Sequence, residues 1–176
     1  MRRERRQGPE RTAPALVPYV GVAGASQPEQ ELVEVAEVLG RRLAEAGAVV
    51  VCGGGSGVMA AVCRGVAAVG GTSIGLLPGD HRRDGNQYLD VALTTGLGEG
   101  RNVLLVRASD ALVAVGGGFG TLSEIALALR IGVPVVGLRT WSLGLEGRPV
   151  DAFPVATDPA EAARLALASA AARMTR

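Results

Sequence analysis

Residues 111–130 read ALVAVGGGFGTLSEIALALR, and the pattern of this stretch is the clearest indication of the fold. Apolar residues run from Ala111 to Val115, glycines follow at positions 116, 117, 118 and 120, and apolar residues then return at helical spacing. The pattern predicts a buried strand, a glycine turn and a helix. Glycines let bare backbone N–H groups approach a ligand, and the first turn of a helix adds unpaired donors and a partial positive charge. We therefore expect this turn to bind an anion, in the first place a phosphate.

The same pattern occurs twice earlier in the chain. An apolar strand at residues 17–23 leads into Gly24 and Ser26, and a second strand at 48–52 leads into GGGSG at 53–57. Ser26 and Glu29 have the spacing of a capping box, which predicts the start of a helix. If the strands are parallel, all three turns lie at one edge of the sheet, where such folds bind ligands. The candidate phosphate- or nucleotide-binding residues are Gly24, Ser26, Gly53, Gly54, Gly55, Ser56, Gly117, Gly118, Gly120 and Thr121.

The rest of the chain continues the alternation of strands and helices. Asp158 is expected to cap an alanine-rich terminal helix. Strands that are apolar from end to end are typical of a parallel sheet covered on both faces. We therefore predict one Rossmann-like α/β domain over residues 17–176, with a mostly parallel sheet of six or seven strands flanked by helices on both faces. The further strands are expected at 72–77, 90–94, 133–138 and 153–156.

The N-terminal residues, 1–16, combine charged residues, proline and glycine without periodicity, which predicts a disordered basic tail. Two glutamates offset part of the positive charge of its five arginines, and the segment has no aromatic residue. The whole chain has a net charge of only +1. Nucleic acid is therefore not an expected partner. No apolar run approaches the length of a signal peptide or a membrane span, so we expect a soluble, cytoplasmic protein.

Composition also excludes several kinds of site. The chain contains no lysine, which excludes a Walker-type phosphate loop and a Schiff base with pyridoxal phosphate. The first glycine turn lacks the G-x-G-x-x-G spacing, so a dinucleotide cofactor is not expected. Cys52, Cys63 and His81 do not make a recurrent zinc site, and we predict neither a metal nor a cofactor. The two cysteines are expected to be small buried thiols.

Three segments carry a family resemblance. They are CGGGSGVMAAVCRGVAAVGGTSIGLLP at 52–78, Arg101, and GGGFGTLSE at 116–124. Together they resemble the Lonely Guy family of cytokinin-activating phosphoribohydrolases and its relatives, which include Rossmann-type molybdenum cofactor carrier proteins. The resemblance covers roughly residues 18–138. It implies a homodimer with a Rossmann-like fold, in a family whose founding members hydrolyse the N-glycosidic bond of an adenosine-type 5′-monophosphate to give base and ribose 5-phosphate.

The resemblance also assigns roles to residues. It places the essential glutamate at Glu124, an arginine at Arg101, and Thr121 beside the phosphate. An oxocarbenium-like sugar needs negative charge and a positioned water, both of which Glu124 would supply, whereas a guanidinium positions ligands rather than donating protons. Thr121 and Glu124 also have capping-box spacing, so a purely structural role for the carboxylate stays open. The family's phosphate-binding glycines correspond to Gly117, Gly118 and Gly120.

The chain departs from the enzymes at two points. They usually have Pro-Gly-Gly where this chain has GGG at 116–118, and Arg-Lys where it has Arg101 and Asn102. Two hypotheses follow. The first is a nucleoside 5′-monophosphate phosphoribohydrolase with Glu124 and Arg101 as catalytic residues. The second is a non-catalytic carrier of a phosphorylated ligand such as molybdenum cofactor, which the two departures favour.

Overall fold

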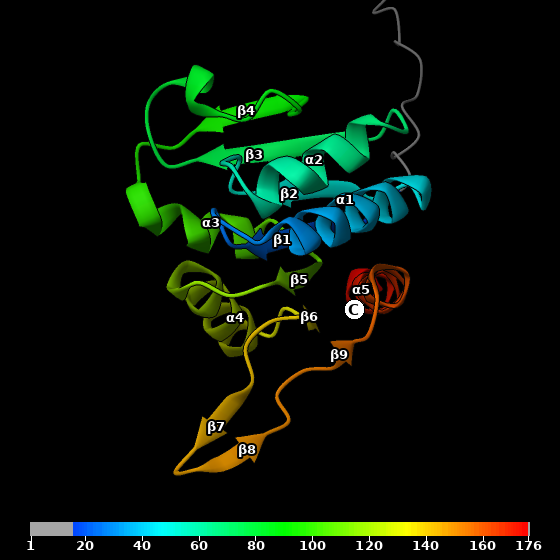
Figure 1. The fold of residues 1–176 in the computed structure, drawn as a ribbon, viewed down its shortest axis with the longest axis vertical. Helices are drawn as coiled ribbons and strands as arrows, with labels where there is room; N and C mark the ends of the chain where they lie inside the picture. Colours follow the sequence, from blue (N-terminus) through cyan, green and yellow to red (C-terminus); the bar gives the residue numbers. More distant parts are fainter. Residues whose placement is uncertain (1–15, 176) are drawn as a thin grey trace, which may run out of the picture.

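The computed structural model describes residues 16–175, so the predicted tail lies outside the described residues except for Leu16. Within this range five helices surround a seven-stranded sheet, and two further strands form a hairpin (Figure 1). The strands are β1 (Tyr19–Gly24), β2 (Val49–Cys52), β3 (Thr72–Leu77), β4 (Val91–Thr94), β5 (Ala111–Val115), β6 (Val135–Leu138), β7 (Leu143–Leu145), β8 (Arg148–Val150) and β9 (Val155–Ala156). The helices are α1 (Gln30–Glu45), α2 (Val58–Ala67), α3 (Arg101–Arg107), α4 (Phe119–Ile131) and α5 (Pro159–Met174).

The sheet has the order β4-β3-β2-β1-β5-β6-β9, and every pair in it is parallel. The chain builds outward from β1 to β4, returns to the centre, and then builds outward again from β5. The order of connection therefore reverses between β1 and β5. In doubly wound sheets the ligand crevice lies at the carboxyl ends of the strands at this switch point. The predicted Rossmann-like architecture is confirmed.

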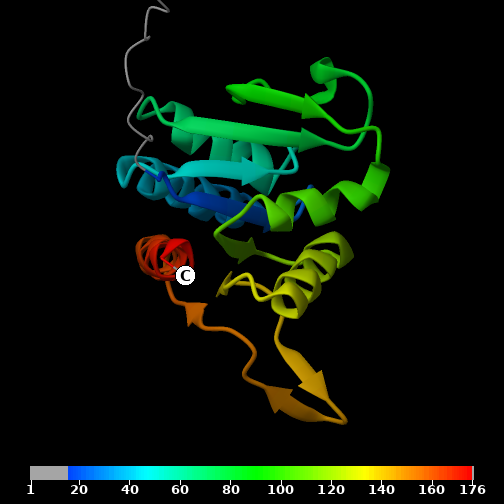
Figure 2. The same ribbon diagram turned by 180° about the vertical axis from the view of Figure 1, so that it is seen from behind.

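Helices cover both faces of the sheet. One face carries α1, α2 and α5, and the opposite face carries α3 and α4 (Figures 1 and 2). On the first face Val22 and Val113 pack in one core with Leu39 of α1. On the second face Leu112 packs in another core with Ile125 of α4. All residues of β5 are buried, because helices lie against both of its faces, and this explains its uninterrupted apolar sequence.

The capping box predicted at Ser26 and Glu29 is wrong. Helix α1 begins at Gln30, and Glu29 occupies the N-cap position without a side-chain capping bond. The reason is tertiary, since the loop before α1 is tied to the second glycine turn instead. The Ser26 carbonyl accepts a hydrogen bond from Ser56 Oγ at 3.1 Å, and the Ala25 carbonyl accepts one from the Val58 N–H at 3.0 Å.

At the C-terminal end one prediction is confirmed and one element was not anticipated. Asp158 caps α5, accepting bonds from the backbone N–H groups of Ala160 at 2.8 Å and Glu161 at 2.9 Å. The segment after Trp141, where no strand was predicted, contains the antiparallel hairpin of β7 and β8. The hairpin extends away from the sheet beyond β6 and β9 (Figures 1 and 2). Its turn places Glu146 and Gly147 at positive φ, 51° and 75°.

Candidate functional site

A pocket of about 750 Å³ lies where the first glycine turn, the start of α3 and the start of α4 meet. Its walls come from segments far apart in the sequence, as expected at the carboxyl ends of strands near the switch point. Most of the candidate residues lie together here. Those that line the pocket are Gly24, Ser26, Gly53, Arg101, Gly118, Gly120, Thr121 and Glu124.

The N-terminus of α4 is open toward this pocket. Gly116 turns the chain at a φ of 65°, and Gly118 forms the N-cap with extended backbone and no side-chain capping bond. The first backbone N–H groups of a helix have no partner within the helix. A Cβ placed on Gly118 or Gly120 would meet no atom within 4 Å, so there is open space beside the backbone of both residues. The arrangement is suited to an anion such as phosphate.

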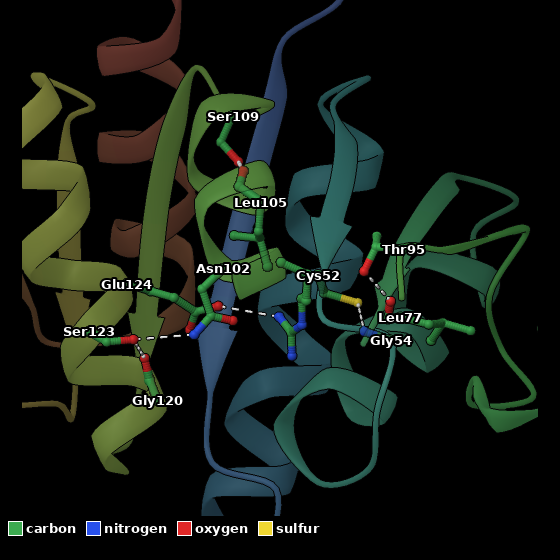
Figure 3. Close-up of polar contacts among 11 residues, drawn as sticks. Cys52, Gly54, Leu77, Thr95, Asn102, Leu105, Ser109, Gly120, Ser123 and Glu124 are labelled. Carbon is green, nitrogen blue, oxygen red and sulfur yellow. Dashed lines mark hydrogen bonds and ion pairs between the residues drawn. The ribbon is translucent and has the colours of Figure 1, made fainter. Parts of the chain in front are cut away.

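Glu124 is a buried carboxyl group at the pocket wall, with only 5% of its surface exposed. Its Oε1 lies 3.4 Å from Nη1 of Arg101 (Figure 3). Burial raises the pKa of Glu124 to about 7, and the nearby positive charge of Arg101 offsets part of that rise. A carboxyl group with this pKa exchanges its proton near neutral pH.

The capping alternative for Glu124 is not supported. Helix α4 begins at Phe119, so Thr121 lies inside the first turn and Glu124 lies further along the helix. A capping box would require Thr121 at the N-cap, a position that Gly118 occupies. The polar contact of the carboxylate is with Arg101, which belongs to a different helix.

Arg101 is the first residue of α3, and its guanidinium packs directly against Gly53. A Cβ at Gly53 would overlap the guanidinium group, so glycine is required there for this arrangement. Among the described residues the Nε of Arg101 is buried and has no hydrogen-bond partner. An unsatisfied buried donor costs about 1–3 kcal/mol, and an oxygen of a bound ligand would relieve that cost.

Four candidate residues lie outside the pocket lining. Gly54 has a φ of 73°, and its N–H donates to Sγ of Cys52 at 3.3 Å. Gly55 and Ser56 face a separate small cavity, and Gly117 packs against the indole of Trp141. In the second glycine turn, Gly53 alone lines the main pocket, while the remainder of the turn holds neighbouring loops in place.

One polar contact of the site was not assigned from the sequence. Asn102, noted only as a departure from the family pattern, donates from Nδ2 to Ser123 Oγ at 3.2 Å, and Ser123 Oγ donates to the Gly120 carbonyl at 2.7 Å (Figure 3). This chain of bonds ties α3 to the first turn of α4. Phe119 is 83% exposed at the pocket, and its ring centroid lies 5.9 Å from that of Trp141.

Other expectations concern absences. Across residues 16–175 no group of three or more His, Cys, Asp or Glu side chains is arranged to hold a metal ion. In the same part of the chain, no helix has both the length and the apolar character needed to cross a bilayer. His81, Arg82 and Arg83 are exposed and do not line the main pocket.

Solved structures with this fold include proteins that handle molybdenum cofactor. The molybdenum cofactor binding protein from the phototrophic bacterium Rippkaea orientalis is 33% identical, with a TM-score of 0.79 over 87% of this chain and 97% of that one. The Moco carrier protein of Chlamydomonas reinhardtii is 32% identical, with a TM-score of 0.78 over 89% of this chain and 99% of that one.

Sequence relatives point to the same superfamily. An uncharacterized protein of Archaeoglobus fulgidus is 41% identical over 121 residues, which are 68% of this chain and 79% of that protein. A probable cytokinin riboside 5′-monophosphate phosphoribohydrolase of Oryza sativa subsp. japonica is 37% identical over 106 residues, which are 58% of this chain. The match spans only 43% of the length of the rice protein.

The model of the SLOG cluster4 family matches residues 17–167, which include every element from β1 through β9 and every residue of the pocket. The chain therefore belongs to the SLOG cluster4 family, within the superfamily of LOG-like proteins and molybdenum cofactor carriers.

Proposed function

We propose that the protein hydrolyses the N-glycosidic bond of a nucleoside 5′-monophosphate, releasing the base and ribose 5-phosphate. One observation carries the proposal. The buried carboxyl group of Glu124 shares a pocket with the open N-terminus of the helix to which it belongs. A phosphate bound at the amides of Gly120 and Thr121 would leave its sugar within the same pocket as Glu124. A carrier of an anionic cargo has no evident use for this acid.

The reaction needs a negative charge beside the sugar. Water adds to C1′ while the bond from C1′ to the base nitrogen breaks, and the base leaves with the electron pair and takes up a proton. The transition state resembles an oxocarbenium ion. Glu124 in its ionised form would stabilise this positive charge and hold the attacking water, and with a pKa of about 7 it is suited to accept the proton of that water.

Arg101 has an electrostatic role in this proposal. A guanidinium group positions ligands by its charge and its hydrogen bonds rather than by donating a proton. Its Nη1 contacts Glu124, and because Arg101 lines the pocket its positive charge would attract a phosphate or ribose oxygen there. The resemblance to the rice phosphoribohydrolase supports this assignment over the part of the chain that the two proteins share.

A second candidate function is a non-catalytic carrier of a phosphorylated ligand such as molybdenum cofactor. Two observations favour it. The solved structures described above match nearly their whole length and are named for molybdenum cofactor binding. In addition, Asn102 brings a neutral amide to a position where the enzymes usually have a cation, and that amide is engaged with Ser123.

A panel of nucleoside 5′-monophosphates separates the two functions. The hydrolase predicts release of base and ribose 5-phosphate in equal amounts from at least one nucleotide. Glu124→Gln should lower the rate by about 100-fold or more, the scale of a lost acid–base group, while Glu34→Gln, on the exposed face of α1, should match the wild type. Tight nucleotide binding with no base release would favour the carrier. If the protein neither releases a base nor binds any phosphorylated ligand, both candidate functions are refuted.

We further propose a cytoplasmic homodimer. Large apolar side chains lie exposed near the pocket, among them Leu97, Val103, Leu104 and Phe119. Val103 and Phe119 also line the pocket, and exposed apolar side chains gathered at one site are typical of an interface. Sedimentation equilibrium should give twice the mass of one chain, and a monomer at micromolar concentration would contradict the proposal.

A further inference from the structure

The two cysteines lie side by side behind the main pocket. Cys52 ends β2, Cys63 lies in α2, and their Sγ atoms are 3.5 Å apart. Both thiols are free and fully buried. The proposed hydrolase chemistry uses neither of them.

The environments of the two thiols differ. The hydrogen bond to Cys63, followed by burial, raises the pKa of Cys52 well above its ordinary value. The hydrogen bond with Cys52 lowers the pKa of Cys63. Burial acts against this shift, and bonds from Asn86 and Ser73 add to it. Cys52 therefore holds its proton more strongly than Cys63 does. Cys63 is the better nucleophile of the two, because thiolates rather than thiols attack oxidants.

A second cavity provides a route to the pair. This cavity, about 350 Å³ in volume, is lined by Ala60 of α2 and by the loop that contains Asn86. Asn86 Nδ2 lies 3.8 Å from Sγ of Cys63, so this side chain contacts both the cavity and the thiol. Ala60 lies one turn before Cys63 on the same helix. A small oxidant in the cavity is therefore separated from Cys63 by little more than one side chain.

We propose that Cys52 and Cys63 form a dithiol–disulfide pair that responds to peroxide. The Cys63 thiolate attacks one oxygen of hydrogen peroxide, the O–O bond breaks, and hydroxide leaves, which gives a sulfenic acid at Cys63. The sulfur of Cys52 then attacks the Cys63 sulfur, the S–O bond breaks, and water leaves with the Cys52 proton. In total the two thiols lose two electrons and become a disulfide, and one hydrogen peroxide gains them and becomes two waters.

The disulfide would act on the main pocket through the backbone. Closing the bond draws two sulfur atoms now 3.5 Å apart to about 2 Å. Cys52 is joined directly to Gly53, against which the Arg101 guanidinium packs. Sγ of Cys52 also accepts a hydrogen bond from the Gly54 N–H (Figure 3). Movement of Cys52 toward α2 withdraws this support from Arg101. The contact between Arg101 and Glu124 lengthens, and the pocket changes shape.

Mass spectrometry tests the oxidation step. The reduced wild-type protein treated with hydrogen peroxide should lose the mass of two hydrogens within one chain and regain it with dithiothreitol. In Cys52→Ser the sulfenic acid at Cys63 should persist and be captured by dimedone, whereas Cys63→Ser should give no dimedone adduct. Melting curves establish that both variants fold. Stepwise addition of oxygen, disulfide bonds between chains, or an unchanged mass would overturn the proposal.

A carboxyl titration tests the coupling to the pocket, and it does not depend on the proposed hydrolase activity. With ¹³C-labelled glutamate, the titration midpoint of Glu124 should rise on oxidation, because Arg101 moves away, and should return on reduction. Cys63→Ser treated in the same way should show no change. An unchanged midpoint in the oxidised wild-type protein would overturn the coupling while leaving the disulfide itself established.

Discussion

Replacing Glu124 with glutamine removes a buried ionisable group with almost no change in side-chain shape. In the folded protein its pKa is about 7, against an ordinary value of 4.5. The folded state therefore binds more protons than the unfolded state between these two pH values, and stability falls as pH rises through this window. Keeping the carboxylate ionised at pH 8 costs about 3 kcal/mol relative to pH 4. Glutamine carries no charge and escapes that cost.

The assay is urea unfolding of the wild type and Glu124→Gln at pH 4 and pH 8, at a fixed protein concentration. The variant should gain about 3 kcal/mol of unfolding free energy relative to the wild type between the two pH values. Glu34→Gln, on the exposed face of α1, should show almost no such gain. If the difference in unfolding free energy between Glu124→Gln and the wild type does not change with pH, then folding does not raise the pKa of Glu124. A change of opposite sign would mean that the attraction to Arg101 outweighs burial.

Four further outcomes follow from the structure. Gly120→Ala should raise the free energy of unfolding by about 0.5–1 kcal/mol in a melting experiment, because the added Cβ meets no atom within 4 Å and alanine favours the helix. The same methyl group should weaken nucleotide binding by covering the backbone amides. An unchanged affinity would contradict the phosphate site. Gly53→Ala should displace Arg101 and raise the NMR titration midpoint of Glu124, and an unmoved midpoint would argue against this contact. Asp158→Ala should cost about 1 kcal/mol in urea unfolding without affecting the pocket, and a loss near zero would show that the cap is energetically unimportant. If hydrolysis occurs, kcat/KM should rise with pH through about 7, because Glu124 acts ionised, and a fall over that range would assign it as an acid instead.

Much of the sheet could be predicted from the sequence. The strands expected at 72–77 and 111–115 have the same bounds in the structure. The second was predictable because a strand buried on both faces of a parallel sheet is apolar throughout. The hairpin of β7 and β8 escaped prediction because each strand has only three residues and the turn uses Glu146 and Gly147 rather than Asn-Gly. The capping box failed because the loop that holds Ser26 is tied to the second glycine turn, where the Ser26 carbonyl accepts a hydrogen bond from Ser56, and local sequence does not show this contact.

The candidate site could be predicted at the level of its elements but not of its geometry. Glycine runs located the loops, and the family resemblance identified Glu124 and Arg101. Which face of a glycine turn meets the ligand depends on backbone torsions, and this is why Gly54 supports the pocket without lining it. The burial of Glu124 and the contact between the two thiols also arise only when distant segments pack together.

In the proposed complex, a phosphate at the N-terminus of α4 holds a sugar against Glu124. A crystal structure of Glu124→Gln with a bound nucleoside 5′-monophosphate would show this geometry. We expect phosphate oxygens within hydrogen-bond distance of the Gly120 and Thr121 amides, with C1′ of the ribose facing residue 124. A phosphate bound elsewhere, or a ribose turned away from residue 124, would contradict it.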